Sequence, residues 1–184
     1  NKFENIKGFK GNSKLLIVGS SWPPEEALVR DFLEGKGNSH NNLKIIFAPH
    51  DLSKKRVNEL LERFSDAALY SKDDFIPSKI LILDTIGMLA SIYQYADYAL
   101  VGGGFSKKGL HNILEPLAWS VPTSFGPKIK HFPEAVHLQS QNICNAIISG
   151  KDLNDFMTYY ADEKNKEAFQ QKLDGFFKTQ KGAS

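Results

Sequence analysis

Residues 98–116 read YALVGGGFSKKGLHNILEP, and this stretch shows the unit from which the fold is built. Four apolar residues, 98–101, are followed by three glycines, and a helical pattern begins at Ile113. A short apolar run between turn residues is typical of a strand buried on both faces of a parallel sheet. The stretch therefore predicts a strand, a glycine turn and a helix in direct succession.

The same alternation of strand and helix runs through most of the chain. Six strands are predicted from the short apolar runs at residues 15–18, 43–48, 67–70, 80–83, 98–101 and 122–125. Helical patterns lie between most of them; one begins at Ser53 and repeats its apolar residues at i, i+3, i+4 and i+7. We predict an α/β fold with a doubly wound, mostly parallel six-stranded sheet and helices on both faces.

The chain divides into three segments. Residues 1–14 are polar and predict a linker, from a preceding domain, that leads into the first strand. Residues 15–150 carry the alternating pattern and form the α/β domain. Residues 151–184 have the apolar spacing of amphipathic helices, which we expect to pack on this domain or on another one.

Composition excludes several classes of protein. The chain has 184 residues, 41% of them hydrophobic, with 23 Lys and Arg against 21 Asp and Glu, as expected of an ordinary globular domain. The nearly balanced charge argues against nucleic acid as the main partner. No apolar run approaches the roughly 20 residues of a membrane-spanning helix, and the single Cys144 cannot form an internal disulfide.

Small and polar residues follow five of the predicted strands, where open parallel sheets bind their ligands. They are Gly19-Ser20-Ser21, His50-Asp51, Asp84-Thr85-Ile86-Gly87, Gly102-Gly103-Gly104 and Gly126-Pro127. The glycines would let a phosphate approach main-chain amides, and Glu115 is placed to accept hydrogen bonds from two ribose hydroxyls. The alternative is a flexible loop with a solvated Glu115, because glycine-rich turns after strands are common in this architecture.

The ordered set of motifs resembles the nucleotide-sugar half of the glycosyltransferase-B fold, and more narrowly the 3-deoxy-D-manno-octulosonic acid (Kdo) transferase family. The matching segments are GSSW at 19–22, DTIGML at 84–89, the block at 101–116, Val121-Pro122, Gly126-Pro127 and Phe132. They run in order across nearly all of residues 13–140. Gly104 stands where that family has Ser, and Leu110 where it has Gly.

The resemblance implies that the domain binds CMP-Kdo. It assigns donor binding to Ser20, Ser21, His50, Thr85, Gly87, Gly102, Gly103, Gly104, His111, Asn112, Glu115, Gly126 and Pro127. The serines and the glycine loop would hold the phosphate and the Kdo carboxylate, and Glu115 the ribose. No metal or other cofactor is expected, because no His, Asp and Glu set has metal-ligand spacing and fixed amides can stabilise a departing phosphate.

One position departs from the family pattern. The family commonly has Arg-His after the second strand, whereas this chain has Pro49-His50-Asp51. If that arginine contacts the donor, Lys54, Lys55 or Arg56 would have to replace it.

The resemblance also implies a reaction. A sugar hydroxyl of a lipid A precursor attacks the anomeric carbon of Kdo and releases CMP, in lipopolysaccharide biosynthesis. The family's catalytic base, acceptor site and membrane anchor belong to an N-terminal domain. We therefore expect this chain to be a soluble part of an enzyme at the cytoplasmic side of the bacterial inner membrane, with no catalytic residue of its own and no activity alone.

Two other functions are open from the sequence. Another enzyme of the same fold, such as a UDP-N-acetylglucosamine epimerase or a different sugar transferase, would differ in its donor. A flavodoxin-like regulatory domain has similar length and alternation, but it needs acidic residues after the first strand, where Gly19-Ser20-Ser21 supplies none. A dinucleotide-binding domain would carry its glycines after the first strand, not the fifth.

Overall fold

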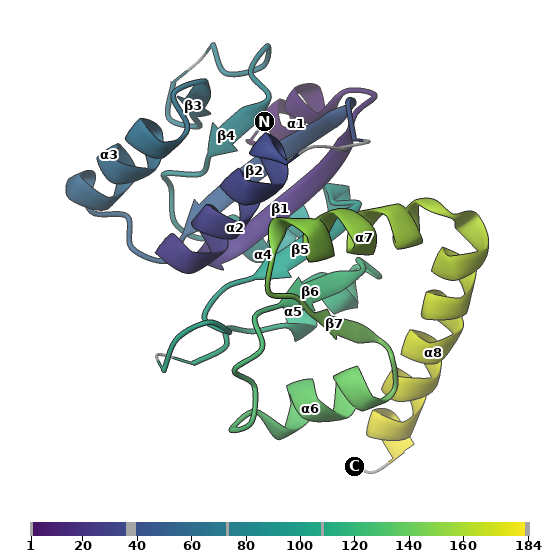
Figure 1. The fold of residues 1–184 in the computed structure, drawn as a ribbon. Coiled ribbons are helices and arrows are strands. Elements are labelled where there is room, and N and C mark those ends of the chain that lie inside the picture. Colours follow the sequence, from purple (N-terminus) through teal and green to yellow (C-terminus); the bar gives the residue numbers. More distant parts are fainter. Residues whose placement is uncertain (1, 36–39, 73, 108, 183–184) are drawn as a thin grey trace.

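The computed structural model describes residues 2–35, 40–72, 74–107 and 109–182. Within these ranges, seven parallel strands form one sheet in the order β3-β4-β2-β1-β5-β6-β7 (Figure 1). The strands are β1 (Lys14–Ser21), β2 (Leu43–Pro49), β3 (Ala67–Leu69), β4 (Ile80–Ile82), β5 (Tyr98–Val101), β6 (Thr123–Phe125) and β7 (Cys144–Ala146). The order reverses between β1 and β5, which makes the sheet doubly wound.

The predicted α/β class is confirmed, with one strand more than expected. β7 pairs with β6 at the edge of the sheet. Of its three residues only Cys144 is buried, so the segment has no apolar run that would indicate a strand.

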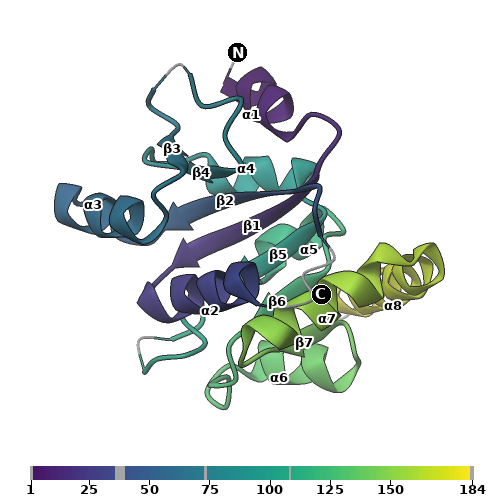
Figure 2. The ribbon, with the colours of Figure 1, turned by 45° about the horizontal axis from the view of Figure 1, so that its top comes forward.

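Helices cover both faces of the sheet (Figure 2). They are α1 (Lys2–Lys10), α2 (Pro23–Glu34), α3 (Lys54–Arg63), α4 (Leu89–Ile92), the 3-10 helix η1 (Tyr93–Tyr95), α5 (Leu114–Ala118), α6 (Pro133–Ser140), α7 (Gly150–Ala161) and α8 (Glu163–Gly182). Ser53 begins α3 as predicted, because its side chain accepts a hydrogen bond from the Arg56 amide. No helix of the described ranges has both the length and the apolar character to cross a membrane.

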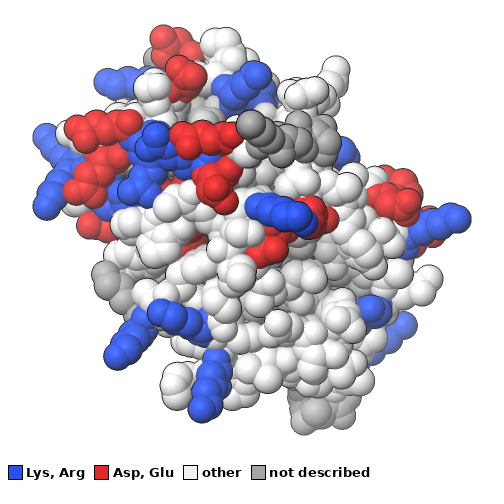
Figure 3. Space-filling model, viewed as in Figure 1, with Lys and Arg blue, Asp and Glu red and all other residues white. Residues whose placement is uncertain are grey.

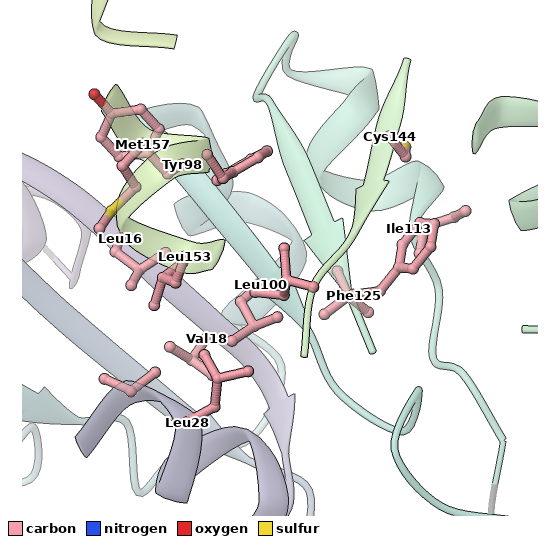
Figure 4. Packing of buried hydrophobic residues seen from close by; sticks show 14 of the residues in the cluster. Leu16, Val18, Leu28, Tyr98, Leu100, Ile113, Phe125, Cys144, Leu153 and Met157 are labelled. Atoms are coloured by element: carbon pink, nitrogen blue, oxygen red, sulfur yellow. The ribbon is translucent and has the colours of Figure 1, made fainter. Parts of the chain in front are cut away.

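The apolar residues of the strands alternate between two cores. Leu16 and Val18 of β1 belong to the core that also takes in α2, α3, α7 and α8. Leu15 and Ile17 point to the other core, with α1, α4 and η1. Figure 4 shows part of the first core, where Leu16 and Val18 lie near Leu28 and Leu153. Because successive strand residues face opposite sides, a continuous apolar run fills both cores.

The prediction of a linker at residues 1–14 is wrong for residues 2–10, which form α1; Asn1 lies outside the described residues. Ile6 and Phe9 are fully buried in the second core. Lys10 also binds Asp97, with 2.7 Å between Nζ and Oδ2. Burial of Asp97 opposes its ionisation, but hydrogen bonds from Lys10 and from the Leu15 amide outweigh this and lower its pKa. The first helix is thus anchored to the sheet.

The C-terminal helices pack on the α/β domain. Phe156, Phe169 and Leu173 lie in the same core as α2 and β5. At the start of α7, the Gly150 amide donates to Asp31 Oδ2 at 2.7 Å, and a Cβ at Gly150 would lie 2.3 Å from the Phe32 nitrogen. α7 therefore lies directly against α2. Residues 183–184 of the predicted C-terminal segment lie outside the described residues.

Candidate functional site

The predicted site residues of β1, β2 and β5 converge at the carboxyl edge of the sheet. Gly19 of β1 pairs with Val101 of β5, and the Gly102 amide donates to the Gly19 carbonyl at 2.8 Å. The His50 amide, just after β2, donates to the Ser21 carbonyl at 3.1 Å. The loops after these three strands thus meet at the point where strand order reverses, as predicted.

The glycine loop is closely packed against other main chain. Residues 102–104 are buried. A Cβ on Gly102 would lie 2.1 Å from the Ser20 carbonyl oxygen, and one on Gly103 would lie 1.9 Å from the Gly109 carbonyl oxygen. Gly103 also has φ +94°, which side chains rarely adopt. These glycines allow three chain segments to approach each other.

The amide of Gly103 already holds an anion, which is the carboxylate of Glu25. Gly103 N–H donates to Glu25 Oε1 at 2.8 Å, and Trp22 N–H donates to Oε2 at 3.0 Å. The Gly102 amide bonds to the Gly19 carbonyl and the Gly103 amide to Glu25, so neither is free to bind the phosphate predicted for this loop. Burial raises the pKa of Glu25, against the lowering effect of these amides, and neighbouring Glu26 raises it further.

The hydroxyl of Ser21 is also engaged inside the protein. It donates to Glu26 Oε1 at 3.0 Å, and Ser21 is buried. Glu26 is paired in addition with the guanidinium of Arg56. The Ser21 hydroxyl, predicted to hold a phosphate, is thus bonded to a buried carboxylate of the protein itself. Arg56 is buried against Glu26, so it does not replace the family's arginine at the site, whereas Lys54 and Lys55 are exposed.

The turn after β6 lies against the glycine loop. A Cβ on Gly104 would lie 2.6 Å from the Gly126 nitrogen, and the Lys128 amide donates to the Gly104 carbonyl at 2.7 Å. Pro127 follows on the surface. Gly126 and Pro127 therefore lie next to the other predicted site residues.

Three aromatic rings stack beside the glycine loop. The ring of His50 lies 4.8 Å from that of Trp22 and 4.4 Å from that of His111, between ring centroids. The indole N–H of Trp22 donates to His111 Nε2 at 3.1 Å. Burial lowers the pKa of His111, and the charge of His50 lowers it further. The sequence predicted both histidines, whereas for Trp22 it favoured packing on Pro23 over shielding a ligand.

Asn112 and Glu115 lie at the start of α5. Asn112 Oδ1 accepts from the Leu114 amide at 3.0 Å, and its Nδ2 donates to Glu115 Oε1 at 3.3 Å. Glu115 is half-buried. Burial raises the pKa of Tyr93, and the negative charge of Glu115 adds to this. The Glu115 carboxylate is thus held by Asn112 at the start of α5, and its charge acts on Tyr93 of η1.

The loop after β4 has a partly structural role. Asp84 accepts hydrogen bonds from the amide and the hydroxyl of Ser71, at 2.9 and 2.6 Å. Thr85 donates to the Met88 sulfur at 3.4 Å, and Gly87 has φ +84°. Ile86 between them is 89% exposed. The structure records no hydrogen bond from Thr85 or Gly87 to the described residues around His111.

A cationic pocket of about 530 Å³ adjoins this edge. It is lined by Ser106, Lys107, Gly109, Lys128, Lys130, His131 and Phe132. His131 and Phe132 also line a second pocket, of about 290 Å³, which includes His111 and Asn112. In Figure 3 the lower left of the molecule shows blue Lys and Arg side chains and no red ones, although Glu134 also lines the second pocket. Positive charge therefore lies next to the stacked histidines.

A larger pocket lies at the opposite edge of the sheet. It has a volume of about 630 Å³ and includes Leu43, Ile45 and Ile80 at the starts of β2 and β4. It contains none of the predicted site residues. Across the described part of the chain, no three His, Cys, Asp or Glu side chains are grouped so that they could hold a metal ion.

No protein-family model matches the chain, but curated relatives do. The Kdo transferase of Chlamydia trachomatis is 32% identical over 176 residues, which cover 92% of this chain and 40% of that protein. The Kdo transferase of Chlamydophila psittaci is 35% identical over 135 residues, which cover 71% of this chain and 28% of that protein. The chain belongs to the Kdo transferase family.

The structural comparison agrees in fold. The C-terminal CMP-Kdo binding domain of WaaA from Acinetobacter baumannii superposes with a TM-score of 0.78 at 22% identity. The match covers 94% of this chain and 97% of that domain. The chain therefore has the fold of this half of a glycosyltransferase-B enzyme, and it spans about 40% of the length of the Chlamydia trachomatis Kdo transferase.

Proposed function

We propose that this chain binds CMP-Kdo and is the donor domain of an enzyme that transfers Kdo to a lipid A precursor. Family membership and the likeness to a CMP-Kdo binding domain support this. The observation that carries the proposal is the contact between the His50 and His111 rings at the edge where the strand order reverses. Asn112 and Glu115 follow His111 at the start of α5. Nucleotides bind at this place in doubly wound sheets.

The chemistry of the edge fits this ligand. The half-buried Glu115 carboxylate would accept from the ribose hydroxyls, and Asn112 holds it in place. CMP-Kdo carries a phosphate and a carboxylate, and the lysines of the adjoining pocket supply the opposite charge. His50 and His111 would face the phosphate between these two regions.

In the reaction, a hydroxyl of the acceptor attacks the anomeric carbon of Kdo, and the bond from that carbon to the CMP oxygen breaks. Negative charge develops on the departing phosphate, and the lysines of the adjoining pocket would stabilise it. A general base must take the hydroxyl proton. We propose that this base, the acceptor site and the membrane contact come from the portion of the relatives that this chain does not cover, so the chain alone is inactive.

Calorimetry with CMP and with UDP-N-acetylglucosamine tests the proposal. CMP should bind, because the site holds a cytidylate, whereas the UDP-sugar should not. Glu115→Gln should weaken CMP about tenfold, the usual effect of losing a hydrogen bond to a charged group. Glu167→Gln on the exposed face of α8 is the matched control and should bind as the unchanged chain does. Binding of the UDP-sugar but not of CMP would contradict the proposal and favour the epimerase alternative.

A further inference from the structure

The hydrogen bond between Trp22 and His111 constrains the chemistry of the histidine. An indole N–H can only donate, so His111 Nε2 must present its lone pair at the 3.1 Å contact. A neutral imidazole with a lone pair on Nε2 carries its proton on Nδ1. The contact therefore selects the Nδ1–H tautomer of the neutral ring.

The surroundings of His111 hold the ring in this state. The His111 amide donates to the Gly102 carbonyl at 3.0 Å, which fixes the residue to the glycine loop. The His111 ring carbon Cδ2 would lie 3.2 Å from a Cβ on Gly103, so this side of the ring faces the loop. His50 stacks at 4.4 Å, and a charge on it would disfavour a second charge on His111. Among the described residues, no side chain accepts a hydrogen bond from Nδ1.

We propose that Trp22 is a positioning residue that fixes His111 in the Nδ1–H tautomer, so that the site offers a phosphate a hydrogen-bond donor rather than a lone pair. The inference rests on the proposed function for the identity of the ligand, the phosphate of a cytidylate. In the other tautomer Nδ1 would carry a lone pair, which cannot donate to a phosphate oxygen and would repel it. Trp22 thus acts on the ligand through the protonation pattern of His111.

Trp22→Phe separates the hydrogen bond from the stacking. Phenylalanine keeps an aromatic ring beside His50 but removes the indole N–H. Trp119→Phe is the matched control, because Trp119 also donates its indole N–H, to the Ala90 carbonyl at 2.8 Å, but lies outside the aromatic stack. Circular dichroism of each variant verifies folding, and Trp22→Leu, which removes both ring and donor, shows the contribution of stacking.

The first readout is the imidazole ¹⁵N spectrum of the ligand-free protein near pH 7.5. The unchanged chain and Trp119→Phe should show His111 with a protonated Nδ1 and an unprotonated Nε2, whereas Trp22→Phe should show a mixture of tautomers. The second readout is CMP affinity, which should fall about fivefold to tenfold in Trp22→Phe, the usual effect of one hydrogen bond.

The possible results distinguish failure of this proposal from failure of the proposed function. A protonated Nε2 in the unchanged chain, or a His111 spectrum that Trp22→Phe leaves unaltered, overturns the proposal. An altered tautomer with unaltered CMP affinity overturns the role in binding. If the unchanged chain binds no CMP, the proposed function fails, and the ¹⁵N spectrum of the free protein alone decides whether Trp22 fixes the tautomer.

Discussion

Replacing Glu25 by Gln tests the hydrogen bonds that organise the glycine loop. The Glu25 side chain is fully buried and accepts from the amides of Gly103 and Trp22, at 2.8 and 3.0 Å. Glutamine has nearly the same shape, but only its side-chain oxygen can accept a hydrogen bond. Its NH₂ group would therefore face one of the two N–H donors and could not accept from it. One buried N–H loses its partner, which costs about 1–3 kcal/mol in the free energy of unfolding.

Urea unfolding measures this cost. Glu34→Gln is the matched control, because Glu34 lies in the last turn of the same helix and is exposed in its pair with Arg30. Glu25→Gln should lower the midpoint of unfolding without changing the slope, whereas Glu34→Gln should leave the midpoint nearly unchanged. Equal midpoints for the two variants would refute the role given to Glu25.

The pH dependence gives a second test of Glu25. Burial raises its pKa above the ordinary 4.5, so the folded chain holds this proton more tightly than the unfolded chain does. The contribution of Glu25 to stability is therefore greatest at low pH and declines as the pH rises above 4.5. The stability difference between the unchanged chain and Glu25→Gln should shrink in the same direction. A difference that grows with pH would contradict this assignment.

Three further results are expected. Gly102→Ala should lower the free energy of unfolding by at least about 2 kcal/mol, because its Cβ would meet the Ser20 backbone. Gly175→Ala on α8, which has open space around it, should raise the free energy of unfolding by about 0.5–1 kcal/mol in the same urea assay. Equal effects of the two substitutions would contradict the packing of Gly102 against Ser20. Cys144 should resist thiol reagents in the native protein and react only in urea, because burial raises its pKa and encloses the sulfur; rapid native labelling would disprove this. CMP affinity measured calorimetrically should be the same in EDTA and in Mg²⁺, since the described residues group no metal-ligand set, and a loss in EDTA would indicate a metal-dependent site.

The parts of the fold that the sequence predicts are those with dense local patterns. β1 and β2 are continuous apolar runs because both faces of each strand are buried. β7 has one buried residue in three, and α1 is held by only a few buried side chains such as Ile6 and Phe9, so neither has a strong local pattern. Where few side chains hold an element in place, the sequence around it looks like a loop.

The candidate site also has parts that the sequence predicts and parts that it does not. The positions of His50, His111 and Glu115 follow from motifs at strand ends. The hydrogen bond from Trp22 to His111 joins residues 89 apart in sequence, and that from Gly103 to Glu25 joins residues 78 apart. No local spacing reveals such contacts, so the buried glutamates and the indole donor become visible only in the folded chain. The local sequence hints at these contacts only through Trp22 at a strand end, which is followed by two prolines and two glutamates.

An amide NMR titration with CMP tests most directly whether the nucleotide binds where strand order reverses. The predicted result is a set of saturable shifts at Ser20, Gly104, His111 and Glu115, with His40 and Lys79 at the opposite edge unaffected. Saturable shifts centred on the 630 Å³ pocket around His40 and Lys79, with the amides of the glycine loop unmoved, would contradict it.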